Sequence, residues 1–198
     1  MRRQLSHSMI CSADLDAAAV LLQQVCEEEV RFPRSPVTPE QVTLNLDHAH
    51  RVRASAAAIA LGEGLNVNLL ELASILHDVC KLDHREVSSG GIDTWHHHHR
   101  GASLARKLLL VDLNLDVQVA EIIARMIESH SDIPFIRRYW ETAYHSSPPT
   151  PATIEEFALR DADAMDLIWI GGMSKIIHIR QVPAPPFMRK TQATSRGQ

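Results

Sequence analysis

An adjacent histidine and aspartate, His77 and Asp78, stand near the end of an apolar run that begins at Leu69. The apolar residues of this run recur at the spacing of one helix face, and His77 continues that face toward the core. Burying an ionised carboxylate beside an imidazole costs several kcal/mol unless a partner compensates, and a metal ion is the usual partner. The pair is therefore either a hydrogen-bonded couple at a helix end or part of a metal site.

Four further helical segments carry a histidine or an aspartate where the apolar stripe calls for Leu or Ile. These residues are His48, His97, His130 and Asp161. A single histidine on an apolar face is usually a satisfied core residue, but that explanation fails for four histidines and two aspartates on five successive segments. We therefore predict that the six side chains share a metal centre. Imidazoles with carboxylates suit Mn²⁺, Fe²⁺, Co²⁺, Ni²⁺ or Zn²⁺ better than Ca²⁺, and Mg²⁺ is a further candidate.

Two positions in this set depend on which face of a helix points inward. In a run of four consecutive histidines, His97 continues the stripe of Leu104, whereas His98 lies on another apolar stripe. We predict His97 as the ligand, with His98 as the alternative. Asp163 stands two residues beyond Asp161 and is expected to point elsewhere on its helix, so we predict that it supports or caps rather than ligates.

The order and spacing of these residues resemble the HD-domain superfamily of metal-dependent phosphohydrolases, over about residues 41–175. Five motifs carry the resemblance: His48-x-x-Arg51-Val52, His77-Asp78-x-x-Lys81, His97-x-x-x-Gly101-Ala102, His130 and Leu159-Arg160-Asp161-Ala162-Asp163. The resemblance implies an all-α fold, an HD-domain helical bundle with a buried metal site. One departure is Cys80, which takes the place of a glycine that often precedes the lysine; the change is conservative in size.

The resemblance also implies a set of ligands for one or two divalent ions. The residues that match the four ligands of active members are His48, His77, Asp78 and Asp161. The residues that match the additional ligands of two-metal members are His97 and His130, with Asp78 as the bridge. We predict two ions; the alternative is a single ion, with the additional histidines hydrogen-bonded to a substrate phosphate.

Two cations follow predicted ligands by about one helical turn, Arg51 after His48 and Lys81 after His77. Beside divalent ions, Lys81 is best explained as a clamp on a substrate phosphate, and Arg51 is a weaker candidate for the same task. The alternative for Lys81 is a surface lysine that favours the dipole of its helix. We predict that Asp78 and Lys81 are catalytic and that Lys81 and Arg51 bind the substrate.

By resemblance, the expected activity is hydrolysis of a phosphoester or phosphoanhydride bond in a nucleotide or related small phosphorylated substrate, by metal-activated water. Two alternatives remain open: a di-iron oxygenase of the same fold, and a catalytically idle domain that binds a nucleotide as a sensor. The chain contains neither a G-x-x-x-x-G-K-[ST] string nor a G-x-S-x-G string. A P-loop mechanism and a serine-nucleophile mechanism are therefore not indicated.

The composition is that of a globular protein, with 45% hydrophobic and 22% charged residues. With 20 Lys+Arg against 24 Asp+Glu, the net charge is −4 and no basic tract stands out, so broad nucleic-acid or membrane binding is not expected. Three cysteines show neither metal-binding nor disulfide spacing. No apolar run is long enough to cross a bilayer. The N-terminus is not followed by the sustained apolar segment of a signal peptide, so a signal peptide is not expected. We therefore expect a cytoplasmic protein.

Prolines, glycines and capping residues divide the chain into elements that position these side chains. Three units are expected: an N-terminal helix and linker over 1–40, packed on the core; the metal-binding domain over 41–182; and a loose tail over 183–198. No strand is predicted. Besides the helices of His48 and His77, helices are predicted at about 14–30, 97–110, 116–129, 153–170 and 173–180. The long loop over 83–95 is a candidate lid.

Overall fold

The computed structural model describes residues 10–33, 35–83, 97–131 and 149–168. Over these ranges the chain forms six α-helices and one π-helical segment, and it forms no strand. In chain order the elements are α1 (Ser12–Arg31), α2 (Pro39–Glu63), α3 (Val67–Leu76), α4 (His97–Lys107), η1 (Leu108–Asp112), α5 (Val117–Ser129) and α7 (Ile154–Ile168). The predicted all-α class is confirmed.

Some predicted elements lie outside the described residues. These are the candidate lid beyond residue 83, the short helix over 173–180 and the tail over 183–198. Within the described ranges, no helix is both long enough and apolar enough to cross a membrane.

Local sequence signals explain how α2 and α3 begin and end. At the start of α2, the Thr38 hydroxyl accepts from the Gln41 N–H at 3.3 Å and the Gln41 side chain accepts from the Thr38 N–H at 2.8 Å. The helix ends at Gly64, whose φ of 66° is the left-handed conformation that glycine adopts without strain. Asn66 then caps α3 by accepting from the Leu69 N–H at 3.1 Å. The turn between the two helices therefore fixes where α3 starts.

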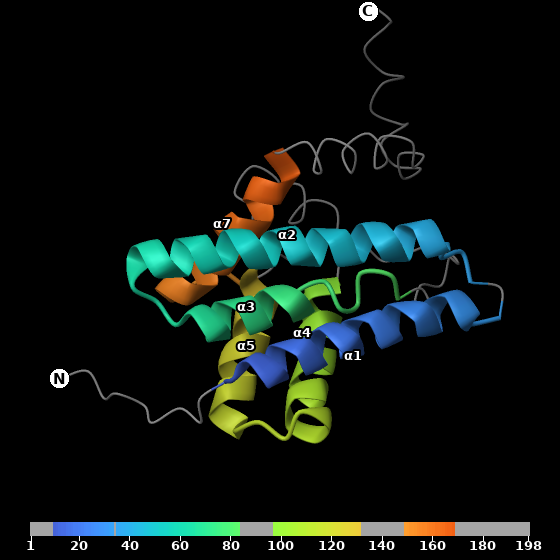
Figure 1. The fold of residues 1–198 in the computed structure, drawn as a ribbon, viewed down its shortest axis with the longest axis horizontal. Coiled ribbons are helices and arrows are strands. Elements are labelled where there is room, and N and C mark those ends of the chain that lie inside the picture. The colour runs from blue at the N-terminus through green and yellow to red at the C-terminus, as the bar shows by residue number, and fades with distance from the viewer. Residues whose placement is uncertain (1–9, 34, 84–96, 132–148, 169–198) are drawn as a thin grey trace, which may run out of the picture.

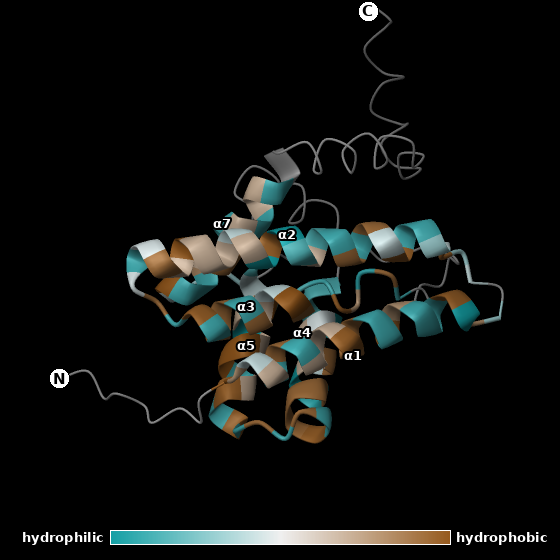
Figure 2. Ribbon diagram, viewed as in Figure 1, coloured by the Kyte–Doolittle hydropathy of each residue, from teal (hydrophilic) through white to brown (hydrophobic). Residues whose placement is uncertain are grey.

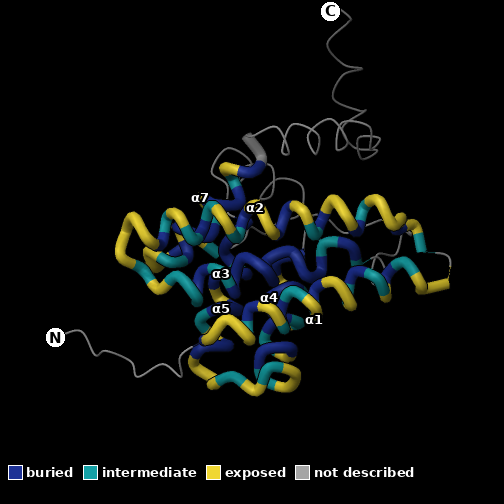
Figure 3. The backbone as a smooth tube through the Cα atoms, in the orientation of Figure 1, coloured by how far each residue is buried: buried dark blue, intermediate teal, exposed yellow. Residues whose placement is uncertain are grey.

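α3 is the central helix of the bundle and packs against α1, α2, α5 and α7. α1 and α2 lie along the long axis of the molecule, while α4 and α5 pack together to one side of this axis, at the bottom of the view, where hydrophobic residues are abundant (Figures 1 and 2). Every residue from Leu69 to Cys80 except Glu71 is buried, and this stretch is dark blue in Figure 3. The end of α3 consequently carries His77 and Asp78 into the interior.

The inward face of α7 differs from the predicted one. The apolar stripe on which Asp161 was predicted also contains Ile154, Phe157 and Met165, but these three residues are 52%, 39% and 42% exposed. The buried residues of α7 include Leu159, Ala162, Asp163 and Asp166. The helix packs against α2. This prediction was wrong because the two buried carboxylates find partners on α2, so hydropathy alone pointed to the opposite side of the helix.

Candidate metal centre

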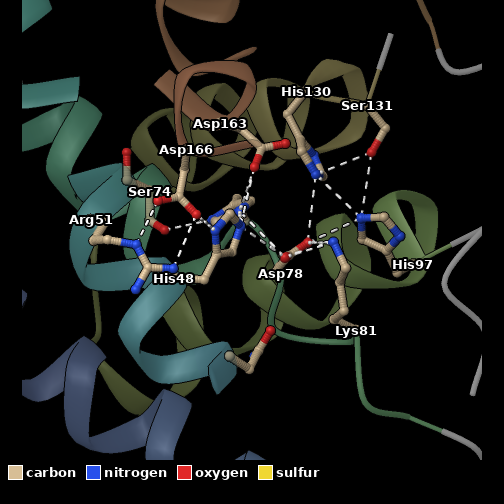
Figure 4. A network of polar contacts seen from close by, with 12 residues as sticks. His48, Arg51, Ser74, Asp78, Lys81, His97, His130, Ser131, Asp163 and Asp166 are labelled. Carbon is tan, nitrogen blue, oxygen red and sulfur yellow. Dashed lines mark hydrogen bonds and ion pairs between the residues drawn. The ribbon is translucent and has the colours of Figure 1, made fainter. Parts of the chain in front are cut away.

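Six buried side chains from five parts of the fold converge between α2, α3 and α7 on one side and α4 and α5 on the other (Figure 4). None of them is more than 7% exposed. They are His48 on α2, His77 and Asp78 at the end of α3, His97 on α4, His130 at the end of α5 and Asp163 on α7. Five of the six predicted ligands, all except Asp161, therefore meet in one place.

The backbone orients two of the histidines. His77 Nδ1 lies 2.7 Å from the carbonyl oxygen of Ser74, and His130 Nδ1 hydrogen-bonds to the carbonyl of Ile127. Because a carbonyl can only accept, each Nδ1 must donate, which leaves Nε2 as the ring nitrogen facing the cluster. Both rings are therefore held in the tautomer that a metal ligand needs.

Asp78 lies between two pairs of histidines and divides its oxygens between them (Figure 4). Its Oδ2 is 3.3 Å from His48 Nε2 and 3.5 Å from His77 Nε2. Its Oδ1 is 3.1 Å from His97 Nε2 and 3.7 Å from His130 Nε2. A single carboxylate thus connects both pairs, with one oxygen directed to each.

The two sides of Asp78 are completed by different groups. Asp163 Oδ1 lies 3.1 Å from His48 Nε2 and 3.7 Å from His77 Nε2, and these three residues with Asp78 Oδ2 form what we call the His48 half. On the other side, the buried hydroxyl of Ser131 lies 3.1 Å from His130 Nε2 and 3.4 Å from His97 Nε2. These three residues with Asp78 Oδ1 form the His97 half.

The prediction that Asp161 faces this cluster was wrong. Its side chain is 56% exposed and its carboxylate pairs with the Arg160 guanidinium at 2.6 Å. Asp163 occupies the place that was expected for Asp161. Residues two apart on a helix point about 200° apart, so only one of the two aspartates can face the cluster. A signal was available: Leu159, Ala162, Asp163 and Asp166 follow the i, i+3, i+4, i+7 pattern of one helix face.

Of the two histidine registers on α4, the structure brings His97 into the cluster. Among the described residues, His97 belongs to a group of donors close enough to share an ion, and His98 belongs to none. His98 is nonetheless buried, at 1% exposure, and its ring stands at 90° to that of His97. The stripe shared with Leu104 therefore predicted which of the two histidines lies in the cluster.

The two predicted substrate-binding cations lie in different surroundings. The Lys81 ammonium donates to both oxygens of Asp78, at 2.8 and 3.1 Å, and its side chain keeps 25% exposure. Arg51 instead pairs with Asp166, its Nε 2.6 Å from Oδ1 and its Nη2 3.2 Å from Oδ2. Figure 4 shows Arg51 and Asp78 on opposite sides of His48. This position does not support the predicted substrate contact of Arg51.

Burial and charge shift the pKa values of the cluster in opposite directions. Burial alone would lower the pKa of His48, but hydrogen bonds that its ring donates to the carboxylates of Asp163, Asp166 and Asp78 raise it to about 9. Burial and the nearby Lys81 charge lower the pKa of His97 to about 4. In the absence of an ion, a proton on His48 therefore supplies the positive charge that the neighbouring carboxylates require.

The Asp78 and Asp163 carboxyl groups are ionised despite their burial. Burial would raise the pKa of Asp78, but the adjacent Lys81 charge and His77 hold it well below its usual range. Burial acts in the same way on Asp163, where hydrogen bonds to His48 and His77 hold the pKa well below its usual range. The cluster thus presents two buried negative charges among imidazole nitrogens.

This donor set fits divalent metal ions. The described residues contain three groups of possible ligands, and within each group the ligand atoms lie within 4.8 Å of one another. The groups are His48–His77–Asp78, Asp78–His97–His130 and His77–His130–Asp163, the last of which spans both halves. Imidazole nitrogens combined with carboxylate oxygens suit first-row transition ions, whereas an all-oxygen site would suit Ca²⁺ or Mg²⁺.

The described residues form an all-α bundle around a buried histidine–aspartate cluster that could hold a metal ion, which is the architecture of a class of helical metal-binding proteins. The family model of the HD domain matches residues 45–168, which is more than half of the chain. The chain therefore belongs to the HD-domain family, and the predicted resemblance is confirmed.

A solved structure supports the same fold. It is the crystal structure of a predicted HD superfamily hydrolase from an uncultured Thermotogales bacterium, with a TM-score of 0.51 and 20% sequence identity. The match covers 81% of this chain and 74% of that one. At this identity the likeness concerns the fold alone. A comparison with curated protein sequences gave no match.

Proposed function

We propose that the protein is a metal-dependent phosphohydrolase that cleaves a phosphoester or phosphoanhydride bond in a nucleotide or related small phosphorylated substrate. The observation that carries the proposal is the position of Asp78, with one oxygen toward each histidine pair and the Lys81 ammonium 2.8 Å away. Two adjacent cation sites beside a lysine form a strongly electropositive surface, which suits an anionic phosphate.

In this proposal the His48 half holds one ion and the His97 half holds a second, with Asp78 shared between them. Divalent ions bound by these donors would lower the pKa of a bound water molecule and act as Lewis acids toward a phosphoryl oxygen. The single-ion version leaves His97 and His130 to hydrogen-bond the substrate phosphate. Both versions require Asp163, which replaces Asp161 in the proposed ligand set.

Lys81 is proposed to bind the substrate phosphate. Its ammonium already lies at the edge of the cluster, and its remaining exposure of 25% leaves it accessible to an entering anion. The contact with Asp78 restrains the Lys81 side chain, so less conformational entropy is lost when it binds a phosphate. Asp78 has the additional role of orienting the reacting groups, because it contacts both halves and Lys81.

The test is a screen of nucleotides and phosphate esters with Mn²⁺, Co²⁺, Ni²⁺ and Mg²⁺, with phosphate release as the readout. We expect turnover that requires one of these ions and that Asp78→Asn abolishes. Lys81→Ala is expected to raise KM and lower kcat while the protein keeps its metal. Asp112→Asn, at the exposed end of η1, is the control that should leave turnover unchanged.

Two results would contradict the proposal in favour of the other functions. Iron-containing, coloured protein that consumes O₂ without releasing phosphate would indicate a di-iron oxygenase. Saturable nucleotide binding without turnover, with any of the ions, would indicate a sensor. Iron analysis and calorimetric titration of nucleotides therefore accompany the screen.

A further inference from the structure

We propose that Asp166, held in place by Arg51, is a positioning residue that keeps His48 oriented for metal binding. The inference rests on the proposed metal centre. His48 Nδ1 lies 2.6 Å from Asp166 Oδ2, on the side of the ring opposite the cluster. Both side chains are almost completely buried, His48 at 0% and Asp166 at 4% exposure, so water does not compete for this hydrogen bond.

His48 needs such a partner because its own helix cannot provide one. His77 and His130 stand at helix ends and donate to backbone carbonyls three residues earlier. His48 lies in the middle of α2, where the carbonyls are engaged in the helix. Its partner therefore comes from α7, 118 residues later in the chain. A carboxylate is also a stronger acceptor than a carbonyl, and it raises the basicity of a metal-ligating imidazole.

One turn of α7 contacts both ring nitrogens of His48. Asp163 Oδ1 lies 3.1 Å from Nε2, and Asp166, one turn further on, lies 2.6 Å from Nδ1. Because Asp166 accepts at Nδ1, the proton that remains when an ion binds stays on Nδ1, and the Nε2 lone pair faces Asp78 and Asp163. The spacing of the two aspartates thus links ligand and orienting carboxylate in a single helical turn.

Arg51 fixes the orienting carboxylate in turn. It lies one turn after His48 on α2 and donates from Nε to Oδ1 at 2.6 Å and from Nη2 to Oδ2 at 3.2 Å. Such forked pairs restrain a carboxylate in both distance and plane. Arg51 also balances the charge of the buried Asp166 carboxylate. The pair His48-x-x-Arg51 on α2 therefore acts together with Asp163-x-x-Asp166 on α7.

The test compares metal affinity, measured without substrate by competition with a chelating dye for Mn²⁺ and Co²⁺. Asp166→Asn keeps the shape of the side chain and removes its charge. We expect affinity to fall roughly 10–100-fold, the usual cost of losing a partner of a metal-bound histidine. Arg51→Gln leaves Asp166 in place and is expected to give a smaller loss. The visible absorption spectrum of the Co²⁺-loaded Asp166→Asn protein should also change, because the ligand ring is no longer fixed.

Glu71→Gln is the matched control. Glu71 pairs with Arg53 Nε at 2.8 Å and joins α3 to α2, much as Asp166 joins α7 to α2, but neither residue is part of the cluster. Its removal measures the cost of losing an interhelical ion pair of this kind. We expect unchanged metal affinity and an unchanged Co²⁺ spectrum for this variant.

The outcomes separate the inference from the proposed function. If the unaltered protein binds none of the tested ions, both fail. If it binds them and Asp166→Asn retains the same affinity and Co²⁺ spectrum, only the positioning role fails. Circular dichroism establishes that each variant is folded. Should Asp166→Asn not fold, Arg51→Gln decides: a loss of affinity supports the role, and unchanged affinity overturns it.

Discussion

The two halves of the candidate metal centre share Asp78 but surround it with different charges. In the His48 half, Asp163 contacts the histidines directly and Asp166 contacts His48 from behind. In the His97 half the corresponding group is the neutral hydroxyl of Ser131. The same type of residue consequently has very different proton affinities, with a pKa of about 9 for His48 and about 4 for His97. At His48 three carboxylates outweigh the effect of burial on the pKa, whereas at His97 burial and the Lys81 charge prevail.

This contrast predicts two ions of unequal affinity, with the tighter one in the His48 half. Removal of the shared carboxylate should have the largest effect. Asp78→Ala is expected to lose both ions, each weakened by more than the roughly 10–100-fold that loss of an outer partner costs, and to reduce turnover to background. Metal analysis after gel filtration provides the measurement. A variant that retains two ions per chain would show that Asp78 does not bridge the halves.

The next prediction separates the halves. Asp163→Ala should lose the tighter ion, whereas His130→Ala should keep it and lose only the weaker one. Metal stoichiometry and chelator competition distinguish these outcomes. Asp161→Ala is the matched control on the same helix, because its exposed carboxylate pairs only with Arg160 among the described contacts. Full loss of metal in Asp161→Ala, with retention in Asp163→Ala, would make Asp161 the ligand in place of Asp163.

Acidity offers a further way to compare the halves. His48, with a pKa raised from 6.5 to about 9 in the folded protein, stabilises the metal-free state fully below pH 6.5 and loses this contribution as the pH rises through 9. His97, lowered to about 4, has the opposite effect, and stability is lost as the pH falls from 6.5 toward 4. The metal-free protein should therefore be most stable near pH 6.5. Thermal unfolding after chelator treatment, followed across pH, tests this optimum.

Metal binding should release a proton from the His48 half only. At pH 7.5, an ion that binds His48 must displace the proton on its ring, whereas His97 is already neutral. We expect about one proton released with the tighter ion and none with the weaker one. Calorimetry in buffers of different ionisation enthalpy measures this number. Equal release for both ions would remove the predicted asymmetry.

The smallest effect is expected at Ser131. Ser131→Ala removes one neutral hydrogen-bonding group from the His97 half, a change of about 1 kcal/mol or less. The weaker ion should lose affinity by a fewfold, and the tighter ion should be unaffected. Dye competition resolves the two steps. A larger loss than that of His130→Ala would indicate that the hydroxyl is itself a ligand.

The fold class and most of the cluster could be predicted from the sequence because their signals are local. His48, His77 and His130 each interrupt an apolar stripe on their own helix, so a single segment shows which way they point. Asp78 follows directly from its neighbour. The helical periodicity was strong enough that the ends of the predicted helices agree with the structure to within about three residues over the described ranges.

The inward face of α7 and the role of Arg51 were harder to predict, because both depend on residues outside their own helix. Phe157 and Met165 lie on an apolar stripe that stays exposed, while the buried side of the helix carries two aspartates beside Leu159 and Ala162. The burial of these aspartates becomes favourable only through their partners on α2. Likewise, nothing near Arg51 in the sequence reveals Asp166, since the two are 115 residues apart and meet only when α2 and α7 pack together.

The wide spacing of the ligands along the chain has a consequence for unfolding. An ion in the His48 half would tie α2 to α7 and so close a loop comparable to that between His48 and Asp166, which are 118 residues apart. A link of this span restricts the unfolded chain as a disulfide does, even though the closure entropy grows only slowly with loop length. The ion would then serve as a removable cross-link. Metal-loaded protein should therefore resist proteases that digest the protein after a chelator has removed its metal.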